Sequence, residues 1–331
     1  MAMKHKYLFV TLLLLILALT GFGFTKAYVG FSQQQGKEEL LIVTSFYPVY
    51  VAVQNVAGDC ENVVVQNLSE PQTGCLHDYQ LTPQDMILLS QADIFVVNGG
   101  GMESFLLDIA EEYPDLTIID AGAAIFRESD SHDHTDTEDE SISHTEDSLD
   151  STEHSHEDHS HGENAHAWMS CHHYTEQITA IRDGLMATDP AHKDSYKTQA
   201  AAYLAKVEKL WREASKLQTA AQGQNVILLH EAFEYLAEDY GFTVAAELNL
   251  DEERQISAGE IAHILDTIQA QKIKIIFAED LYGKDIGDTI EKETDCKVYY
   301  LNTLTRGDGS ADGWLNGMEE NLRTLREALN G

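Results

Sequence analysis

The sequence predicts an α/β protein with two similar lobes, each built on a parallel-type sheet, joined by one long rigid helix. Apolar runs alternate with helical patterns from residue 40 to 119, and the alternation returns after residue 226. Such alternation is typical of parallel sheets with crossover helices. We expect a first lobe over 38–188, the helix over 189–221 and a second lobe over 222–331.

The first lobe is expected to alternate four strands with three helices. Thr82 precedes Pro83, a typical helix start, because the threonine oxygen can accept a backbone N–H bond and proline lacks an N–H that would need a partner. The expected strands are 40–44, 63–68, 94–97 and 117–119, and the expected helices are 49–56, 83–90 and 102–110.

The second lobe repeats this order. Ser257 and Glu260 form the S-x-x-E capping box, which predicts a helix start just before Ile261. The expected strands are 226–229, 244–248, 273–277 and 298–301, and the expected helices are 231–239, 261–268, 286–292 and 314–329.

Residues 189–221 contain no glycine or internal proline and repeat apolar side chains at helical spacing. At about 1.5 Å per residue, one helix of this length could cross most of a lobe. We therefore expect a stiff connector between the lobes.

The N-terminus resembles an export signal. Lys4 and Lys6 precede an apolar run over 7–19, so residues 1–31 are expected to be a signal peptide or a membrane anchor. Both alternatives remain open, and no cysteine directly follows the run to carry a lipid. The mature part is expected outside the cytoplasm, anchored at the cell surface or secreted.

Four cysteines suit an oxidising compartment. We favour a bridge between Cys60 and Cys75, because both lie close together in the same expected lobe. For Cys171 and Cys296, a bridge and buried free thiols remain equal alternatives.

The formal net charge is −35 and the pI is about 4.5, which disfavours nucleic acid and favours cations. Residues 127–163 are too polar for a packed core and are rich in histidine, so we expect weak zinc binding there rather than a plain solvated linker. Their histidines are His132, His134, His144, His154, His156, His159 and His161.

Three histidines outside this tract occupy informative positions. His77 and His230 follow expected strands, where ligands of parallel sheets lie, and His166 comes just after the tract. Each alone is more often structural. Three neutral imidazoles with room for a fourth ligand would make a zinc site.

Four segments carry a resemblance to a known family. They read GCLHDYQLTPQD over 74–85, NGGGME over 98–103, NAHAWMS over 164–170 and LHEAFEY over 229–235. Their order and spacing resemble the metal-specific substrate-binding proteins of zinc and manganese ABC importers, over the chain from about Leu40 to Leu329.

The resemblance implies two lobes joined by a rigid helix, a metal in the cleft between them and a permease partner in the membrane. A His-rich loop before His166 is typical of the zinc branch of the family. The manganese branch usually has a carboxylate where this chain has His230, so zinc is expected rather than manganese. We expect a monomer.

One departure concerns the fourth ligand. The family often places a carboxylate just after the last strand, and none occurs at that place here. Water, Asp308 or, as the weaker alternative, Asp312 could complete the site. We expect the ligand set His77, His166, His230 and Asp308.

Other function classes are less well supported. His230 and Glu231 begin an H-E-x-x-H pattern, but Glu234 stands where the second histidine is needed, so we expect no enzyme and rank a zinc hydrolase last. A surface adhesin or a metal buffer with this fold remains an alternative. His172, His173, His192 and His263 are expected to be surface residues.

Overall fold

The computed structural model describes residues 39–70, 76, 79–129, 164–248, 250, 256–279 and 283–330, with the backbone alone at 127–129. Contacts divide the chain between Leu40 and Leu41, and all that follows concerns the second unit. Within the described part, no helix is long and apolar enough to cross a membrane. The 1–31 segment, Cys75, His77 and residues 130–163 of the predicted tract over 127–163 lie outside the described residues.

The first sheet has the strand order β2-β1-β3-β4. Strand β3 is parallel to both β1 and β4, with Phe95 in register with Val43 and Ile118. All four residues of β3 are buried, as a central strand requires. The strands are β1 (Leu40–Thr44), β2 (Val63–Asn67), β3 (Ile94–Val97) and β4 (Thr117–Asp120).

The helices of this lobe begin where local chemistry favours them. Asp85 N donates to Thr82 Oγ1 at 3.3 Å, and Thr82 N donates to Asp85 Oδ2 at 2.7 Å. This reciprocal cap confirms the predicted start at Pro83. The helices are α2 (Tyr47–Ala57), α3 (Pro83–Leu89), α4 (Leu106–Glu112) and α5 (Ala123–Ser129).

The predicted connector over 189–221 is helical throughout most of its length but is not one uniform helix. Its main part is α7 (Lys193–Ala214), and the ends contain 3₁₀ turns at Pro190–His192 and Ser215–Leu217 before the short helix α8 (Gln218–Ala221). Asp189 starts the first turn, since its carboxylate accepts from Ala191 N at 3.2 Å.

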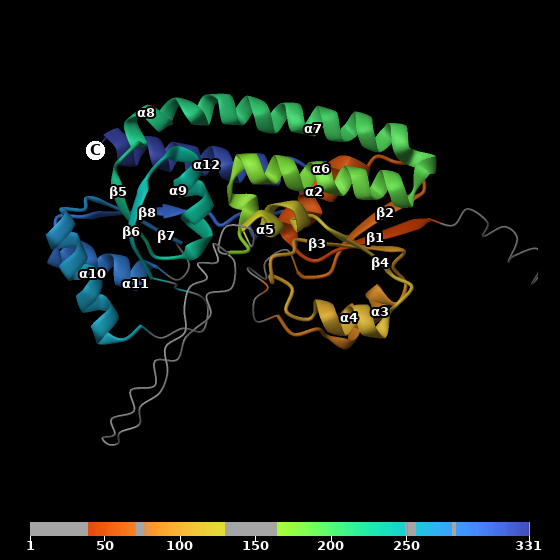
Figure 1. The fold of residues 1–331 in the computed structure, drawn as a ribbon, viewed down its shortest axis with the longest axis horizontal. Coiled ribbons are helices and arrows are strands. Elements are labelled where there is room, and N and C mark those ends of the chain that lie inside the picture. The colour runs from red at the N-terminus through yellow and green to blue at the C-terminus, as the bar shows by residue number, and fades with distance from the viewer. Residues whose placement is uncertain are drawn as a thin grey trace, which may run out of the picture. The chain divides into compact units, whose positions relative to one another are not determined.

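A helix that the sequence analysis did not predict, α6 (Cys171–Thr188), precedes this connector. Its buried face includes Tyr174, Ile178, Ile181 and Leu185, at helical spacing. Figure 1 shows α7 running beside both α6 and α12 (Gly313–Asn330). The connector is therefore packed along its length rather than isolated in solvent.

The second sheet has the order β6-β5-β7-β8, and all its pairs are parallel. Its predicted strands and helices are confirmed, with ends shifted by a few residues. The strands are β5 (Asn225–Leu228), β6 (Thr243–Glu247), β7 (Ile275–Glu279) and β8 (Lys297–Leu301), and the remaining helices are α9 (Glu234–Tyr240), α10 (Ala258–Gln271) and α11 (Lys284–Glu293).

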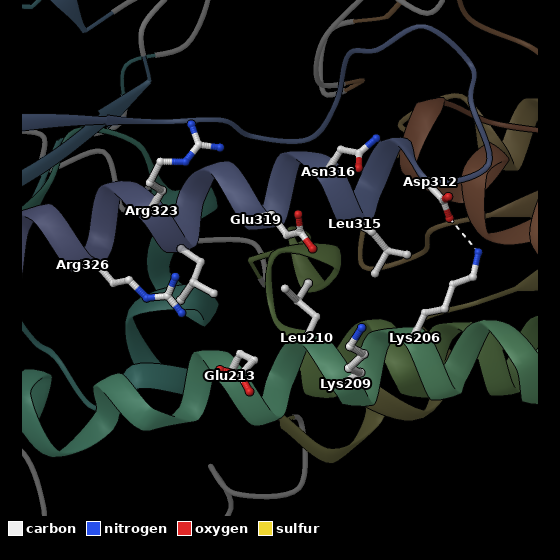
Figure 2. Close-up of a pocket in the computed structure, with 11 residues that line it drawn as sticks. Lys206, Lys209, Leu210, Glu213, Asp312, Leu315, Asn316, Glu319, Arg323 and Arg326 are labelled. Atoms are coloured by element: carbon white, nitrogen blue, oxygen red, sulfur yellow. Dashed lines mark hydrogen bonds and ion pairs between the residues drawn. The ribbon is translucent and has the colours of Figure 1, made fainter.

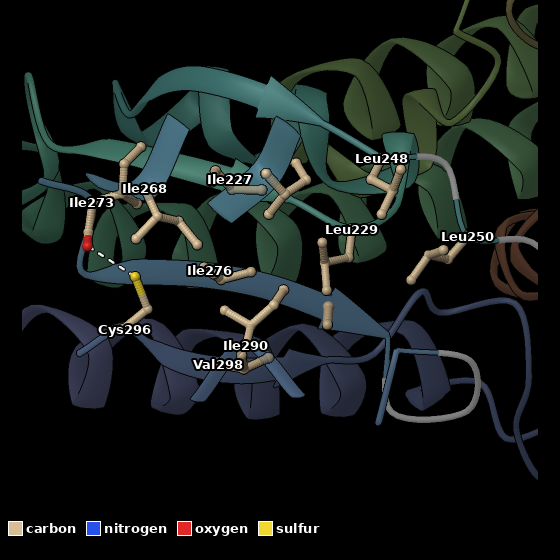
Figure 3. Close-up of a cluster of buried hydrophobic side chains, with 12 residues drawn as sticks. Ile227, Leu229, Leu248, Leu250, Ile268, Ile273, Ile276, Ile290, Cys296 and Val298 are labelled. Atoms are coloured by element: carbon tan, nitrogen blue, oxygen red, sulfur yellow. Dashed lines mark hydrogen bonds between the residues drawn. The ribbon is translucent and has the colours of Figure 1, made fainter. Parts of the chain in front are cut away.

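Aliphatic side chains of β5, β7 and β8 form the core of this lobe against α10 and α11 (Figure 3). Ile227 and Ile276 are buried in the sheet, and Ile268 and Ile290 pack onto them from the helices. Burying such side chains contributes about 1.5–3 kcal/mol each. This core holds the strand ends in place.

The cysteines correct one expectation. Cys60, Cys171 and Cys296 are buried free thiols in the structure, so the favoured bridge from Cys60 is not formed. Gln199 Nε2 donates to Cys60 Sγ at 3.3 Å, and Cys296 Sγ donates to Ile273 O at 2.9 Å (Figure 3). These two thiols are thus engaged in local hydrogen bonds.

Candidate metal centre

His166 lies at the start of the turn η1 (Ala167–Met169), which leads into α6, and it is 0% exposed. Asn164 Oδ1 accepts from both the His166 backbone N at 3.0 Å and the ring Nδ1 at 2.9 Å. The Asn164 amide is itself oriented, because its Nδ2 donates to Glu231 O at 2.9 Å and to Glu234 Oε2 at 2.8 Å. The hydrogen-bond acceptor of the imidazole is therefore a neutral oxygen, with the Glu231 carboxylate farther off, at 3.8 Å from Nδ1.

His230 comes two residues after the end of β5 and is 5% exposed. Its Nδ1 lies 3.1 Å from Glu279 Oε2, at the end of the neighbouring strand β7. The rings of His166 and His230 are 5.3 Å apart between centroids and nearly perpendicular. The structure thus brings together two of the predicted ligands.

Both rings point Nδ1 at an oxygen acceptor. An amide carbonyl or a carboxylate oxygen carries no hydrogen, so in each pair the neutral imidazole must donate from Nδ1. The lone pair then lies on Nε2, which is the nitrogen able to bind a metal. The arrangement of His166 and His230 suits metal binding through both Nε2 atoms.

Glu279 is a residue of the site that the sequence analysis did not assign. Its Oε1 accepts from Thr303 Oγ1 at 3.0 Å, and Thr303 Oγ1 lies 3.1 Å from Thr305 Oγ1. Glu279 is 7% exposed, and both threonines are buried. The signal was available: Glu279 ends a strand next to the one that precedes His230, at the edge where parallel sheets bind ligands.

Two tryptophan side chains donate hydrogen bonds to backbone carbonyls and so connect the His166 segment with the loop after β8. Trp168 Nε1 donates to Thr303 O at 2.8 Å, and Trp314 Nε1 donates to Trp168 O at 3.0 Å. The Trp314 ring stacks on Tyr174 with centroids 4.0 Å apart. The segment that carries His166 is therefore anchored to the segment that follows β8.

A glycine-rich turn after β3 supports His166 from the first lobe. Glu103 accepts from Asn98 N at 2.8 Å and Gly99 N at 3.1 Å, and Asn98 Nδ2 donates to Ala165 O at 2.8 Å. Gly99 has φ +82°, and an added Cβ would meet Asp120, so the turn requires glycine there. Burial raises the pKa of Glu103 to about 7.

The predicted carboxylate ligand, Asp308, is exposed, and its Oδ1 accepts from Ser310 N at 2.9 Å. That hydrogen bond lowers the pKa of Asp308. Asp312 pairs with Lys206 at 2.8 Å in a groove of about 650 Å³ between α7 and α12 (Figure 2). Neither residue is placed with the two histidines.

Over the described ranges, no three His, Cys, Asp or Glu side chains are arranged to hold a metal ion. The structure thus pairs His166 with His230 and does not add Asp308 to them. Because His77 lies outside the described residues, the full set of four ligands stays a prediction.

The other four histidines are all exposed or partly exposed. His172 and His263 are exposed, whereas His173 and His192 are half-buried and pair with carboxylates. His173 Nδ1 lies 3.0 Å from Glu176, and His192 Nδ1 lies 2.5 Å from Asp189. Both side chains keep about a quarter of their surface exposed, at 24% for His173 and 26% for His192, so they lie at the surface while pairing with a carboxylate.

Comparison with known proteins yields a family match. The family ZnuA, described as zinc-uptake complex component A, periplasmic, matches residues 42–328. The zinc-binding lipoprotein AdcA of Streptococcus pneumoniae is 30% identical over 89% of this chain, and the chain spans only 57% of AdcA. The high-affinity zinc uptake system protein ZnuA of Bacillus subtilis is 27% identical over 95% of this chain and 94% of that protein.

Solved structures show the same fold. The substrate-binding protein FpvC of Pseudomonas aeruginosa in complex with Ni²⁺ has a TM-score of 0.71 at 24% identity, over 88% of this chain and 97% of that one. The laminin-binding protein of Streptococcus agalactiae, described as having adhesin and metal transporting activity, has a TM-score of 0.66 at 25% identity, over 88% of this chain and 99% of that one. Among the sequence relatives is the manganese-binding lipoprotein MntA of Halalkalibacterium halodurans, 24% identical over 88% of this chain and 89% of that protein. The similarity to FpvC supports the two-lobe α/β fold alone.

Proposed function

This chain belongs to the ZnuA family of periplasmic zinc-uptake components, and on that premise we propose that it captures zinc outside the cytoplasm and delivers it to an ABC importer permease. The observation that carries the proposal is the buried pair His166 and His230, which both keep Nε2 as the lone-pair nitrogen. Zinc here is the transported substrate. The proposal assigns the chain no catalytic role.

Zinc is preferred over manganese because of the donor set. Imidazole nitrogen suits zinc, whereas carboxylate and water oxygens suit manganese. The nearest buried carboxylate, Glu279, is already engaged by His230 Nδ1 and Thr303 Oγ1. One relative is a manganese-binding lipoprotein, so manganese is the competing ligand. The imidazole donors of this chain favour zinc over it.

We propose that His77 supplies the third imidazole and that Asp308 or water fills the fourth position. An open position suits a site that must release its metal. The acidic tract is proposed to bind further zinc weakly and to raise its local concentration. The N-terminal segment 1–31 would direct the chain outside the cytoplasm, as anchor or cleaved signal, and the chain would act as a monomer.

Equilibrium metal titration of the full chain in detergent tests the function. A competing chelator masks the weak sites, so that one tight zinc site is expected, with far weaker manganese binding. Equal affinities for the two metals would reject zinc specificity. Absence of any tight metal site would reject the capture function itself.

Alanine variants test the ligand set. His77→Ala, His166→Ala and His230→Ala should each lower the zinc affinity more than the roughly 10- to 100-fold typical of an outer-sphere partner. His263→Ala, at an exposed helical position, is the matched control and should bind like the parent. Asp308→Asn separates a coordinating carboxylate from water, since only the former predicts a loss.

Deleting residues 130–163 tests the tract. The variant should keep one tight site and lose several weaker zinc equivalents, because the tract has clustered imidazoles but no packed structure is expected of it. Loss of the tight site would show that the tract is part of the binding site.

An adhesin function is a second candidate, supported by the structural match to a laminin-binding protein with both activities. Surface plasmon resonance with immobilised laminin, in zinc-loaded and chelated states, tests it. Saturable binding to laminin would support an adhesin function in addition to metal uptake. No laminin binding is expected if the chain acts in uptake alone.

A further inference from the structure

Glu279 is a buried carboxylate whose two oxygens are each committed to one side chain. Oε2 faces His230 Nδ1 at 3.1 Å, and Oε1 accepts from Thr303 Oγ1 at 3.0 Å. A carboxylate with 7% exposure has little water to solvate it, so these two contacts must supply that stabilisation. Its position is thus fixed by the histidine and the threonine together.

The threonine side of the contact is itself anchored. Thr303 O accepts from Trp168 Nε1 at 2.8 Å, and Thr305 Oγ1 lies 3.1 Å from Thr303 Oγ1. Because Thr303 is held at both its carbonyl and its hydroxyl, it can orient the carboxylate of Glu279 toward the imidazole. Buried networks in which each member is bound in this way favour a single arrangement.

The two histidines differ in the charge of their outer partner. His166 Nδ1 is hydrogen-bonded to the neutral amide oxygen of Asn164 at 2.9 Å, and the partly exposed Glu231 carboxylate lies farther away, at 3.8 Å. His230 Nδ1 lies 3.1 Å from the buried carboxylate of Glu279. A carboxylate acceptor fixes the tautomer and ring orientation and increases the basicity of the ligating nitrogen. Glu279 therefore acts on the imidazole that comes from the second lobe and not on the one from the first.

We propose that Glu279 is a positioning residue that sets the zinc affinity through His230 Nδ1, without itself binding the metal. The inference rests on the proposed function. The loop after the last strand, β8, has threonines at positions 303 and 305 and no carboxylate there. The buried carboxylate next to the histidine pair comes from the end of β7. The carboxylate of Glu279 thus contacts Nδ1 of the proposed ligand His230, on the side of the ring away from the metal-binding Nε2.

The test compares zinc affinities of the parent, Glu279→Gln and Glu320→Gln in the full chain, in detergent with a competing chelator. Glutamine has the shape of glutamate and can still accept from Nδ1, but it lacks the charge. Glu279→Gln should bind zinc about 10- to 100-fold more weakly. Glu320, an exposed carboxylate that lines the same pocket as Glu279, is the control: Glu320→Gln should change the affinity by less than about threefold, because water and salt screen an exposed charge.

Two spectroscopic readouts separate positioning from coordination. The absorption spectrum of the cobalt-substituted Glu279→Gln variant should keep the band intensities of the parent, because the number and type of ligands are unchanged. A change in coordination would overturn the proposal in favour of direct ligation. Nitrogen NMR of labelled histidine should show Nδ1–H and metal-bound Nε2 at His230 in the parent, and the opposite tautomer would also overturn it.

The outcomes distinguish this inference from the proposed function. If the parent lacks a tight zinc site, the capture function fails and the inference fails with it. If the parent binds tightly and Glu279→Gln binds equally well, only the inference fails. Should Glu279→Gln not fold, Thr303→Val, which removes the hydroxyl that orients the carboxylate, is expected to lower the affinity by a smaller factor, and parent-like binding would overturn the proposal.

Discussion

Each lobe buries a carboxylate near the carboxyl end of the third strand in its sheet, but the two carboxylates bind different kinds of group. After β3, Glu103 accepts from two backbone N–H groups, those of Asn98 and Gly99. At the end of β7, Glu279 instead binds the side chains of His230 and Thr303. Two sheets with matching strand order thus use one feature for two purposes.

The two carboxylates are expected to have different roles, because they bind different groups. A carboxylate bound to backbone holds a turn in shape, so its loss should affect folding. A carboxylate bound to a ligand histidine holds a ring, so its loss should affect metal affinity. Two predictions at Glu103 test this contrast directly, and two further predictions compare helix packing and a surface ion pair elsewhere in the molecule.

The largest effect on stability is expected for Glu103→Ala. The substitution leaves two buried N–H groups without their acceptor, and each costs about 1–3 kcal/mol. Calorimetry of the metal-free protein should show a loss of about 2–6 kcal/mol. Because the turn also holds Ala165 through Asn98 Nδ2, the zinc affinity of the folded protein should fall, but by less than in Glu279→Gln. A stable variant with weak zinc binding would contradict the division of tasks.

The next largest effect is expected for the change with pH in the contribution of Glu103 to the unfolding free energy. Burial raises its pKa from 4.5 to about 7, so its contribution to stability is fully present below the unfolded value and is lost as pH rises through the folded value. At about 1.4 kcal/mol per pH unit, the change amounts to about 3 kcal/mol. The difference in unfolding free energy between the parent and Glu103→Gln should follow this profile between pH 4.5 and 7.5, and a flat difference would refute it.

Two helical glycines, one in each lobe, should respond with opposite signs. An added Cβ at Gly184 in α6 would lie 2.8 Å from Ile119 Cγ2, so Gly184→Ala should cost about 1–3 kcal/mol. At exposed Gly259 in α10, the nearest atom is Ser257 Oγ at 3.8 Å, so Gly259→Ala should stabilise by about 0.4–1 kcal/mol. Thermal unfolding of both variants measures the two changes in unfolding free energy. Changes of the same sign would contradict the prediction.

The smallest effect is expected at the exposed pair of Lys206, in α7, and Asp312, just before the start of α12 (Figure 2). Exposed ion pairs contribute about 0–1 kcal/mol. Asp312→Asn should therefore alter the unfolding free energy by less than about 1 kcal/mol and leave zinc binding unchanged. A loss of zinc affinity would instead place Asp312 among the ligands.

Most of the secondary structure was predictable because its signal is local. Strand β3 was predicted with its observed ends, and the caps at Thr82 and Ser257 formed as expected. The helix α6 was missed although Tyr174, Ile178, Ile181 and Leu185 follow helical spacing. Many residues of this segment are polar, so the helical signal of its sequence is weak. The helix is stabilised by packing of its apolar face against α7 and β4.

The fold class, the order of elements and the candidate histidines could be predicted from the sequence, because hydrophobic period, capping residues and position after strands are local properties. Three features depend on tertiary contacts: the approach of His166 to His230, the donation from Nδ1 of each ring, and the contact of Glu279 with His230. These residues are far apart in the chain. Their contact depends on the order in which β5, β7 and β8 pair, and buried packing across the whole lobe selects that order.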